Sequence, residues 1–175
     1  MTAAPLKTSP LLNRLLISCV LAAALAGVAR PAAAQAPIVA SLDDAFIAHE
    51  PSSDLWTIGS RGLELAIGFG ADRVLSLQRL SDPVSGRMLN ITPGADVSLT
   101  AGGSHVELTN GGPTSLVGVQ TLADDRGVRL VFTFEHPQLH VRLVRTYACY
   151  PGSPTIETWT RIEPLVVPIT SAASS

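Results

Sequence analysis

The sequence of 175 residues contains two cysteines and no run of basic residues, and both features limit what the chain does. Cys19 lies in an N-terminal leader that we expect to be removed, so Cys149 has no partner for an internal disulfide. The remaining chain has nine arginines against fourteen acidic residues, a net charge of −5. Nucleic acid and anionic membrane surfaces are therefore poor candidate partners.

Residues 1–34 have the features of a secretory signal peptide. Lys7 and Arg14 precede an apolar run over 15–29, and the small side chains of Ala32 and Ala34 predict cleavage after Ala34. An uncleaved anchor is the alternative, but a transmembrane helix needs about 20 apolar residues, more than this run supplies. We therefore expect a periplasmic or secreted protein of one domain, with no stable membrane insertion after cleavage.

The chain has no long amphipathic helical pattern, and short apolar segments alternate with glycine and proline turns. Residues 35–53 are interpreted as a lead-in segment compatible with a short helical turn, which Asp43 and Asp44 would cap. Nine strands are expected at 55–58, 63–69, 74–80, 97–100, 105–108, 115–122, 128–135, 139–150 and 155–162. This spacing predicts an all-β fold, an antiparallel β-sandwich over 54–163 with an irregular tail over 164–175.

The last three segments can be aligned with one another. A tight turn over 136–139 would place Phe132 opposite Leu143, although its proline favours a wider loop. A turn over 151–154 places Leu143 opposite Ile162. Strict alternation then gives these strands one apolar face, on which Arg145 also falls, either at an edge of the core or paired with an acid.

The opposite face of the same strands carries an aromatic side chain among charged ones. We single out Trp159, Glu157, Arg161 and Arg142 as substrate-binding or domain-interface candidates, because sugars stack their C–H faces on aromatic rings while polar neighbours hold their hydroxyl groups. The alternative, of similar weight, is a solvated sheet face on which arginine stems partly cover the tryptophan.

Residues 145–161 read Arg-Thr-Tyr-Ala-Cys-Tyr-Pro-Gly-Ser-Pro-Thr-Ile-Glu-Thr-Trp-Thr-Arg. Together with Trp56-Thr-Ile-Gly and Gly62-Leu-Glu-Leu-Ala-Ile67, this signature resembles the N-terminal β-sandwich of the α-galactosidase-like glycoside hydrolases of family 36. The resemblance implies a partial supersandwich of the galactose-mutarotase type. In that family the sandwich precedes a catalytic (β/α)₈ barrel that supplies two aspartates. No segment here corresponds to the barrel, so no catalytic residue, metal or cofactor is carried over.

The residues themselves form no catalytic constellation. Retaining glycoside hydrolysis needs two carboxyl groups about 5 Å apart, whereas Asp124 and Asp125 fit a hairpin turn better. His136 and His140 would lie about 13 Å apart on a strand, too far to share a metal ion. Cys149 has no neighbouring base and is expected to be a buried, inert thiol.

The leading hypothesis is the non-catalytic N-terminal β-sandwich of an exported α-galactosidase-like glycoside hydrolase that acts on α-galactosides. Its partners would be an α-galactoside carbohydrate or the catalytic barrel domain, which this chain lacks. The alternative is a free-standing extracytoplasmic carbohydrate-binding or structural β-sandwich protein. Beyond Ile162 the family's further strands are missing, and we expect the chain to be a truncated product.

Overall fold

The computed structural model describes residues 36–92, 94–101 and 103–165, which belong to one compact unit that begins at Ala36. The predicted signal peptide and most of the predicted tail lie outside the described residues. Within the described part the regular structure is β-strand, apart from one 3-10 turn, η1 (Pro137–Leu139). No helix in these residues is long and apolar enough to cross a membrane. The all-β class predicted from the sequence is therefore confirmed.

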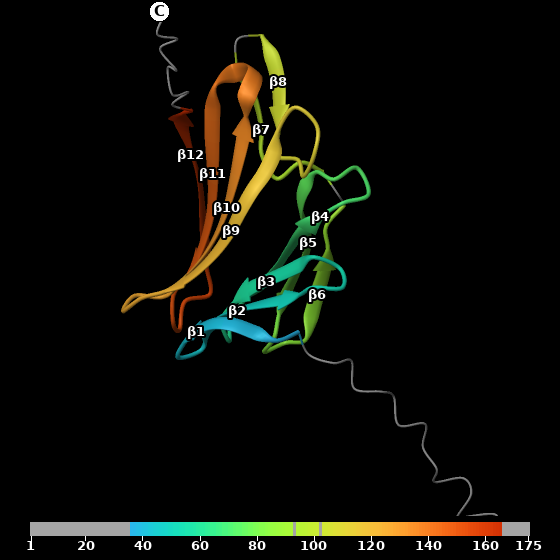
Figure 1. The fold of residues 1–175 in the computed structure, drawn as a ribbon. Helices are drawn as coiled ribbons and strands as arrows, with labels where there is room; N and C mark the ends of the chain where they lie inside the picture. The colour runs from blue at the N-terminus through green and yellow to red at the C-terminus, as the bar shows by residue number, and fades with distance from the viewer. Residues whose placement is uncertain (1–35, 93, 102, 166–175) are drawn as a thin grey trace, which may run out of the picture. The chain divides into compact units, whose positions relative to one another are not determined.

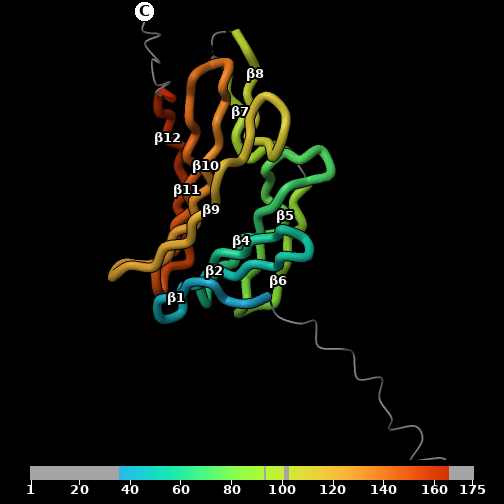
Figure 2. Tube along the Cα trace, in the orientation of Figure 1, coloured from blue at the N-terminus to red at the C-terminus, as the bar shows by residue number. Residues whose placement is uncertain are grey.

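Twelve strands form two large antiparallel sheets and a hairpin (Figures 1 and 2). The six-stranded sheet contains β1 (Ile38–Leu42), β2 (Ala45–Glu50), β3 (Leu55–Gly59), β4 (Glu64–Phe69), β5 (Leu75–Asp82) and β6 (Arg87–Asn90), in chain order. The four-stranded sheet contains β9 (Ser115–Ala123), β10 (Val128–His136), β11 (Val141–Cys149) and β12 (Ile156–Pro164), and the hairpin contains β7 (Ser98–Ala101) and β8 (Ser104–Glu107). β1 contacts β9, β2 contacts β10 and β3 contacts β11, so the two sheets pack face to face.

All nine predicted strands are present, with no end shifted by more than two residues. The helical turn expected within 35–53 is wrong, because β1 and β2 occupy this segment and Asp43-Asp44 forms the turn between them. Ala45 and Ile47 are fully buried against the other sheet, and this burial favours a strand. The six-stranded sheet thus begins at Ile38, ahead of the domain start expected at residue 54. β6 was also missed, because all four of its residues are exposed and carry no apolar alternation.

The two inner faces share one apolar core, in which β10 contributes every second side chain. Phe132 lies at the centre and makes edge-to-face contacts with Trp56, Phe69 and Tyr147, at 6.1 to 6.3 Å between ring centroids. Such pairs each contribute about 0.5–1.5 kcal/mol beyond the burial of their area. Phe132 therefore joins three different strands and links both sheets.

The pairing of β11 with β12 is confirmed, with Leu143 opposite Ile162. The tight-turn register between β10 and β11 is wrong by two residues, since Phe132 lies opposite Arg145 and Phe134 opposite Leu143. η1 supplies the wider loop, in which His136 accepts a hydrogen bond from the Leu139 N–H. A shift of two residues preserves the face of each side chain.

The acid that pairs with Arg145 is Asp96, in the connection between β6 and β7. The guanidinium donates to both Asp96 oxygens, at 2.6 and 3.0 Å, and the Tyr147 hydroxyl donates to Oδ2 at 2.5 Å. The Asp96 side chain is 3% exposed. Burial, reinforced by the Asp96 carboxylate, raises the pKa of Tyr147, so its phenol stays protonated as a donor. This cluster fixes the connection to β11.

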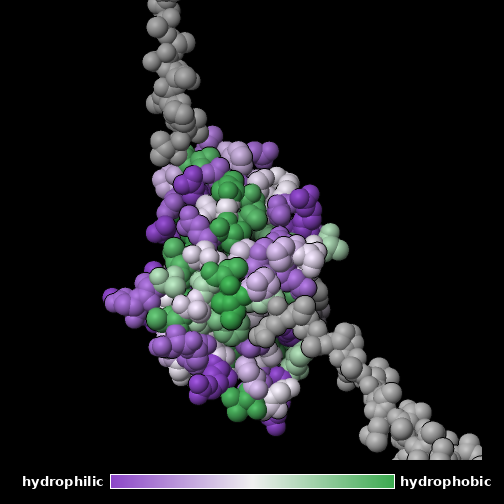
Figure 3. Space-filling model, turned by 60° about the horizontal axis from the view of Figure 1, so that its bottom comes forward, coloured by the Kyte–Doolittle hydropathy of each residue, from purple (hydrophilic) through white to green (hydrophobic). Residues whose placement is uncertain are grey.

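Single apolar side chains also reach the surface, and the space-filling view shows apolar patches set among polar ones (Figure 3). Ile38 and Val39 of β1 are 57% and 46% exposed. Scattered exposure of this kind is ordinary for a folded domain and does not by itself mark a binding site.

Asp96→Ala should lower the free energy of unfolding by about 3 kcal/mol, because it leaves the Arg145 guanidinium in the protein interior without its carboxylate. Equilibrium unfolding in urea measures the change. Asp125→Ala, which removes an exposed turn acid, is the control and should change stability by less than about 0.5 kcal/mol. A loss below about 1 kcal/mol for Asp96→Ala would show that the cluster does not hold the connection in place.

Asp44 should make stability depend on pH. Its carboxylate accepts the N–H of Gly152 at 2.8 Å and of Arg61 at 3.2 Å, and these donors, Gly152 first, lower the pKa of Asp44 below its ordinary 3.8. The folded state thus favours the charged form, whose stabilisation is present at neutral pH and is lost as the pH falls through that lowered pKa.

Asp44→Asn should therefore be less stable than the unchanged chain at pH 7, and the difference should shrink on acidification below about pH 4. Thermal unfolding across this range measures it. Asp43→Asn removes one charge from the same turn and serves as the control. A constant difference across the range would refute this role for Asp44.

Candidate functional site

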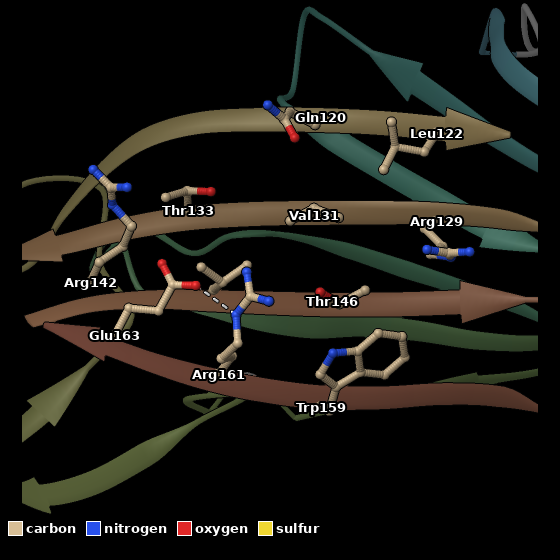
Figure 4. Close-up of a pocket in the computed structure, with 11 residues that line it drawn as sticks. Gln120, Leu122, Arg129, Val131, Thr133, Arg142, Thr146, Trp159, Arg161 and Glu163 are labelled. Atoms are coloured by element: carbon tan, nitrogen blue, oxygen red, sulfur yellow. Dashed lines mark ion pairs between the residues drawn. The ribbon is translucent and has the colours of Figure 1, made fainter.

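The outer face of the four-stranded sheet, which points away from the core, carries a shallow groove of about 360 Å³ (Figure 4). We call it the outer groove. All four strands of this sheet contribute side chains to it. The residues that matter for its chemistry are Trp159, Arg161, Arg142, Glu163, Thr146 and Val131.

Two-residue alternation and the β11–β12 register place these side chains together. Thr146 lies opposite Trp159, Val144 opposite Arg161 and Arg142 opposite Glu163. These six side chains of β11 and β12 therefore point to the same side of the sheet. Figure 4 shows the indole of Trp159 near one end of the groove and the charged groups of Arg142, Arg161 and Glu163 toward the other. The groove therefore has an aromatic ring at one end, which we call the aromatic end, and two arginines and an acid toward the other.

The arginines of the groove are paired with acids at its surface. Arg142 donates to Glu135 at 2.7 Å, and Arg161 forms an ion pair with Glu163, with 2.7 Å between Nε and Oε1. Arg129, at the aromatic end, pairs with Asp124. Exposed pairs of this kind contribute at most about 1 kcal/mol each. An incoming polar ligand can therefore redirect these guanidinium donors at low cost.

Trp159 is 43% exposed, although Thr146 opposite it is buried. Its indole face is thus available for stacking while its stem packs on the sheet. An aromatic ring beside polar donors is a common arrangement in binding sites, because the ring buries a large area and the neighbours satisfy polar groups.

Three of the four residues singled out from the sequence, Trp159, Arg161 and Arg142, line the outer groove. Glu157 shares their face of the sheet but is not among the lining residues, and its Oε2 accepts the Tyr150 hydroxyl at 3.0 Å. This hydrogen bond raises the pKa of Tyr150. Glu157 therefore anchors the β11–β12 turn beside the groove.

Gln120 and Leu122 of β9 also line the groove and were missed in the sequence. Their face is hard to predict because the pairing of β9 with β10 is irregular between Thr133 and Phe134. The only local feature that indicates their outward face is the alternation of Gln120 and Leu122 with the half-buried Val119 and Thr121.

The remaining candidates have structural roles. Asp124 accepts the N–H groups of Arg126 and Gly127 in a turn, and the Arg126 N–H, followed by that of Gly127, lowers its pKa. The thiol of Cys149 is buried, and burial raises its pKa, as expected for an unreactive cysteine. No group of three or more His, Cys, Asp or Glu side chains within the described ranges has the geometry to hold a metal ion.

No protein-family model, curated protein or solved structure matches this chain. The kinship with family 36 therefore stays a prediction from the quoted motifs.

The groove, as far as the structure describes it, contains too few carboxyl groups for retaining glycoside hydrolysis, and we therefore predict that the chain alone has no glycosidase activity. Among the described residues that line it, only Glu163 carries a carboxyl group, and that group is paired with Arg161. A retaining mechanism needs a second carboxyl group across the sugar. Release of nitrophenol from 4-nitrophenyl α-D-galactopyranoside should thus equal that in buffer, both for the unchanged protein and for Glu163→Gln. Turnover that the substitution abolishes would overturn this prediction.

Proposed function

We propose that this chain is the N-terminal, non-catalytic β-sandwich of an exported α-galactosidase-like glycoside hydrolase, and that its outer groove contacts α-galactosides. The observation that carries the proposal is the exposed indole of Trp159 in a groove with guanidinium and hydroxyl groups. A catalytic barrel domain is its other proposed partner. The signature over 145–161 and the signal-like leader support the family and the export.

The groove suits a galactosyl ring because such a ring has one apolar face and polar edges. The axial hydroxyl of galactose leaves a continuous patch of C–H groups on the opposite ring face, which stacks on an indole. Arg161 and Arg142 each carry five N–H donors, more than their pairs with Glu163 and Glu135 use. The free donors serve the hydroxyl groups of a sugar stacked on Trp159.

The unequal sheets support a place within a larger sandwich. The six-stranded sheet has two more strands than the four-stranded sheet that covers it. Near β5 and β6, Leu63, Leu80 and Leu89 border an open, largely apolar hollow of about 430 Å³, and Leu89 is 61% exposed. Further strands or a neighbouring domain would bury this surface.

A free-standing carbohydrate-binding or structural β-sandwich outside the cytoplasm is the second candidate. It is favoured by the core, because both sheets bury one continuous apolar cluster of the kind that an independent domain needs. The DNA after codon 175 separates the two candidates. A barrel-coding sequence, in the same or another frame, supports the first candidate, and an unrelated gene supports the second.

Trp159→Ala should weaken binding of raffinose, which carries a terminal α-galactosyl group, by at least about tenfold, since the stacking surface is lost. Isothermal titration calorimetry measures the affinity. The melting temperature should change little, because the indole is partly exposed. Met88→Ala removes a 62% exposed apolar side chain from β6 and should leave binding unchanged.

Three results bear on the proposal. Binding by the unchanged protein that Trp159→Ala does not weaken would remove the outer groove as the sugar site. Absence of any raffinose binding would remove the α-galactoside as its ligand. If Trp159→Ala instead blocks association with a separately produced barrel domain, the groove is a domain interface.

A further inference from the structure

β12 is an edge strand of the four-stranded sheet. It pairs with β11 on one side, and within the described ranges no strand pairs with its other side. Its nine residues thus present a row of backbone N–H and C=O groups that can pair with another strand. Trp159 and Ile162 on this edge strand are 43% and 57% exposed.

The side chains of β12 are arranged almost symmetrically about Trp159. Residues 156–162 read Ile-Glu-Thr-Trp-Thr-Arg-Ile, a palindrome except that an acid on one side of the centre is matched by a base on the other. Such a segment is self-complementary when two copies run antiparallel about a two-fold axis at its centre. In that arrangement Ile156 lies opposite Ile162, Thr158 opposite Thr160, and Glu157 opposite Arg161 of the second copy.

We infer that two copies of this chain associate through β12, antiparallel and with the two-fold axis at Trp159, so that their four-stranded sheets form one eight-stranded sheet. Each pair of opposite side chains is then favourable. The isoleucines meet on the inner face, and two Glu157–Arg161 pairs flank the two indoles on the outer face.

The charges select this register over its neighbours. A two-fold axis perpendicular to the sheet places residues of the inner face opposite residues of the inner face. The axis must therefore pass through one residue of β12, and each alternative register moves it to another residue of the strand. A centre at Thr160 places Glu157 opposite Glu163, and a centre at Arg161 places two arginines opposite each other. A centre at Thr158 leaves Arg161 opposite Thr155, and a centre at Ile162 pairs Arg161 with Glu163 but leaves Glu157 opposite no residue of β12. The centre at Trp159 pairs Glu157 with Arg161 twice and puts no like charges opposite each other, with Glu163 opposite Thr155.

The association joins the two outer grooves across the axis, with the two Trp159 side chains adjacent at its centre. It depends on the edge of β12 and is independent of the proposed sugar binding. A failure of one leaves the other standing, because raffinose affinity and oligomeric state are measured separately.

Charge exchange tests the register in the full chain. Glu157→Arg puts a second arginine opposite Arg161, and Arg161→Glu puts a second acid opposite Glu157, so each should weaken the dimer at least tenfold in sedimentation equilibrium. The double variant E157R/R161E should recover the affinity of the unchanged chain. An equimolar mixture of the two single variants should form a mixed dimer, because both of its charge pairs are again opposite. Glu107→Arg makes the same charge change on β8 and should have no effect.

Cysteine crosslinking locates the axis independently. Trp159→Cys should form an intermolecular disulfide on mild oxidation, because only position 159 lies opposite itself, at the 4.5–5.5 Å between Cα atoms that is typical of antiparallel pairs. Thr158→Cys and Thr160→Cys should crosslink when mixed with each other and not when alone. The unchanged chain, with Cys19 and Cys149, gives the background. Circular dichroism confirms that each variant is folded.

Several outcomes would overturn the inference. These are a monomeric unchanged chain at all accessible concentrations, a dimer that Glu157→Arg does not weaken, or strongest crosslinking at a position other than 159. A monomer whose β12 edge amides are protected from hydrogen exchange would show instead that another segment of the same chain covers this edge.

Discussion

The fold depends on the packing of alternate side chains of β10 against the six-stranded sheet. Val128, Leu130, Phe132 and Phe134 are all fully buried, and the residues between them point outward. Because β10 lies between β9 and β11, its alternation fixes the face of each neighbouring side chain through the register. The outer groove is therefore a consequence of the core. Phe134 and its opposite Leu143 must point inward, and Leu143 lies opposite Ile162 of β12, so Trp159, three residues before Ile162, points outward.

Much of this arrangement is contained in short-range sequence patterns. Glycine and proline turns bound the strands after residue 54, and the turn over 151–154 sets the β11–β12 register, so Trp159, Arg161 and Arg142 were placed on one outward face. The sequence near Leu42 and Phe46 is compatible with a helical turn as well as with a strand, and only burial against the second sheet decides between them. Asp96 could not be predicted as the partner of Arg145, because tertiary folding alone brings together residues 49 positions apart. The groove residues of β9 were missed for a related reason, since an irregular pairing breaks the alternation from which they would be inferred.

The charged residues separate into two classes by their surroundings. The Asp96 carboxylate and the Arg145 guanidinium are nearly inaccessible and share a third partner in Tyr147, so their positions are set by the fold and the cluster is not free to bind a ligand. The pairs of Arg142 and Arg161 with their acids are exposed and individually weak. The pairs that an external partner can reach are therefore those of the second class, on the outer face.

The signature over 145–161 has a structural explanation at several positions. Gly152 has a φ of +68°, which favours glycine, and its N–H donates to Asp44 at the β1–β2 turn. Ser153 accepts a hydrogen bond from Ser60 at 2.7 Å, and Gly62 lies so close to Pro154 that an added Cβ would be 3.3 Å from it. The segments that carry the resemblance, around residue 62 and over 145–161, thus meet in space as a joint between the two sheets. Such a joint specifies how the two sheets meet and says nothing about a ligand, since the outer groove is lined by solvent-facing residues of β9 to β12 that make none of these contacts. Under the proposed function, specificity depends on Trp159 and its charged neighbours, which make none of these joint contacts.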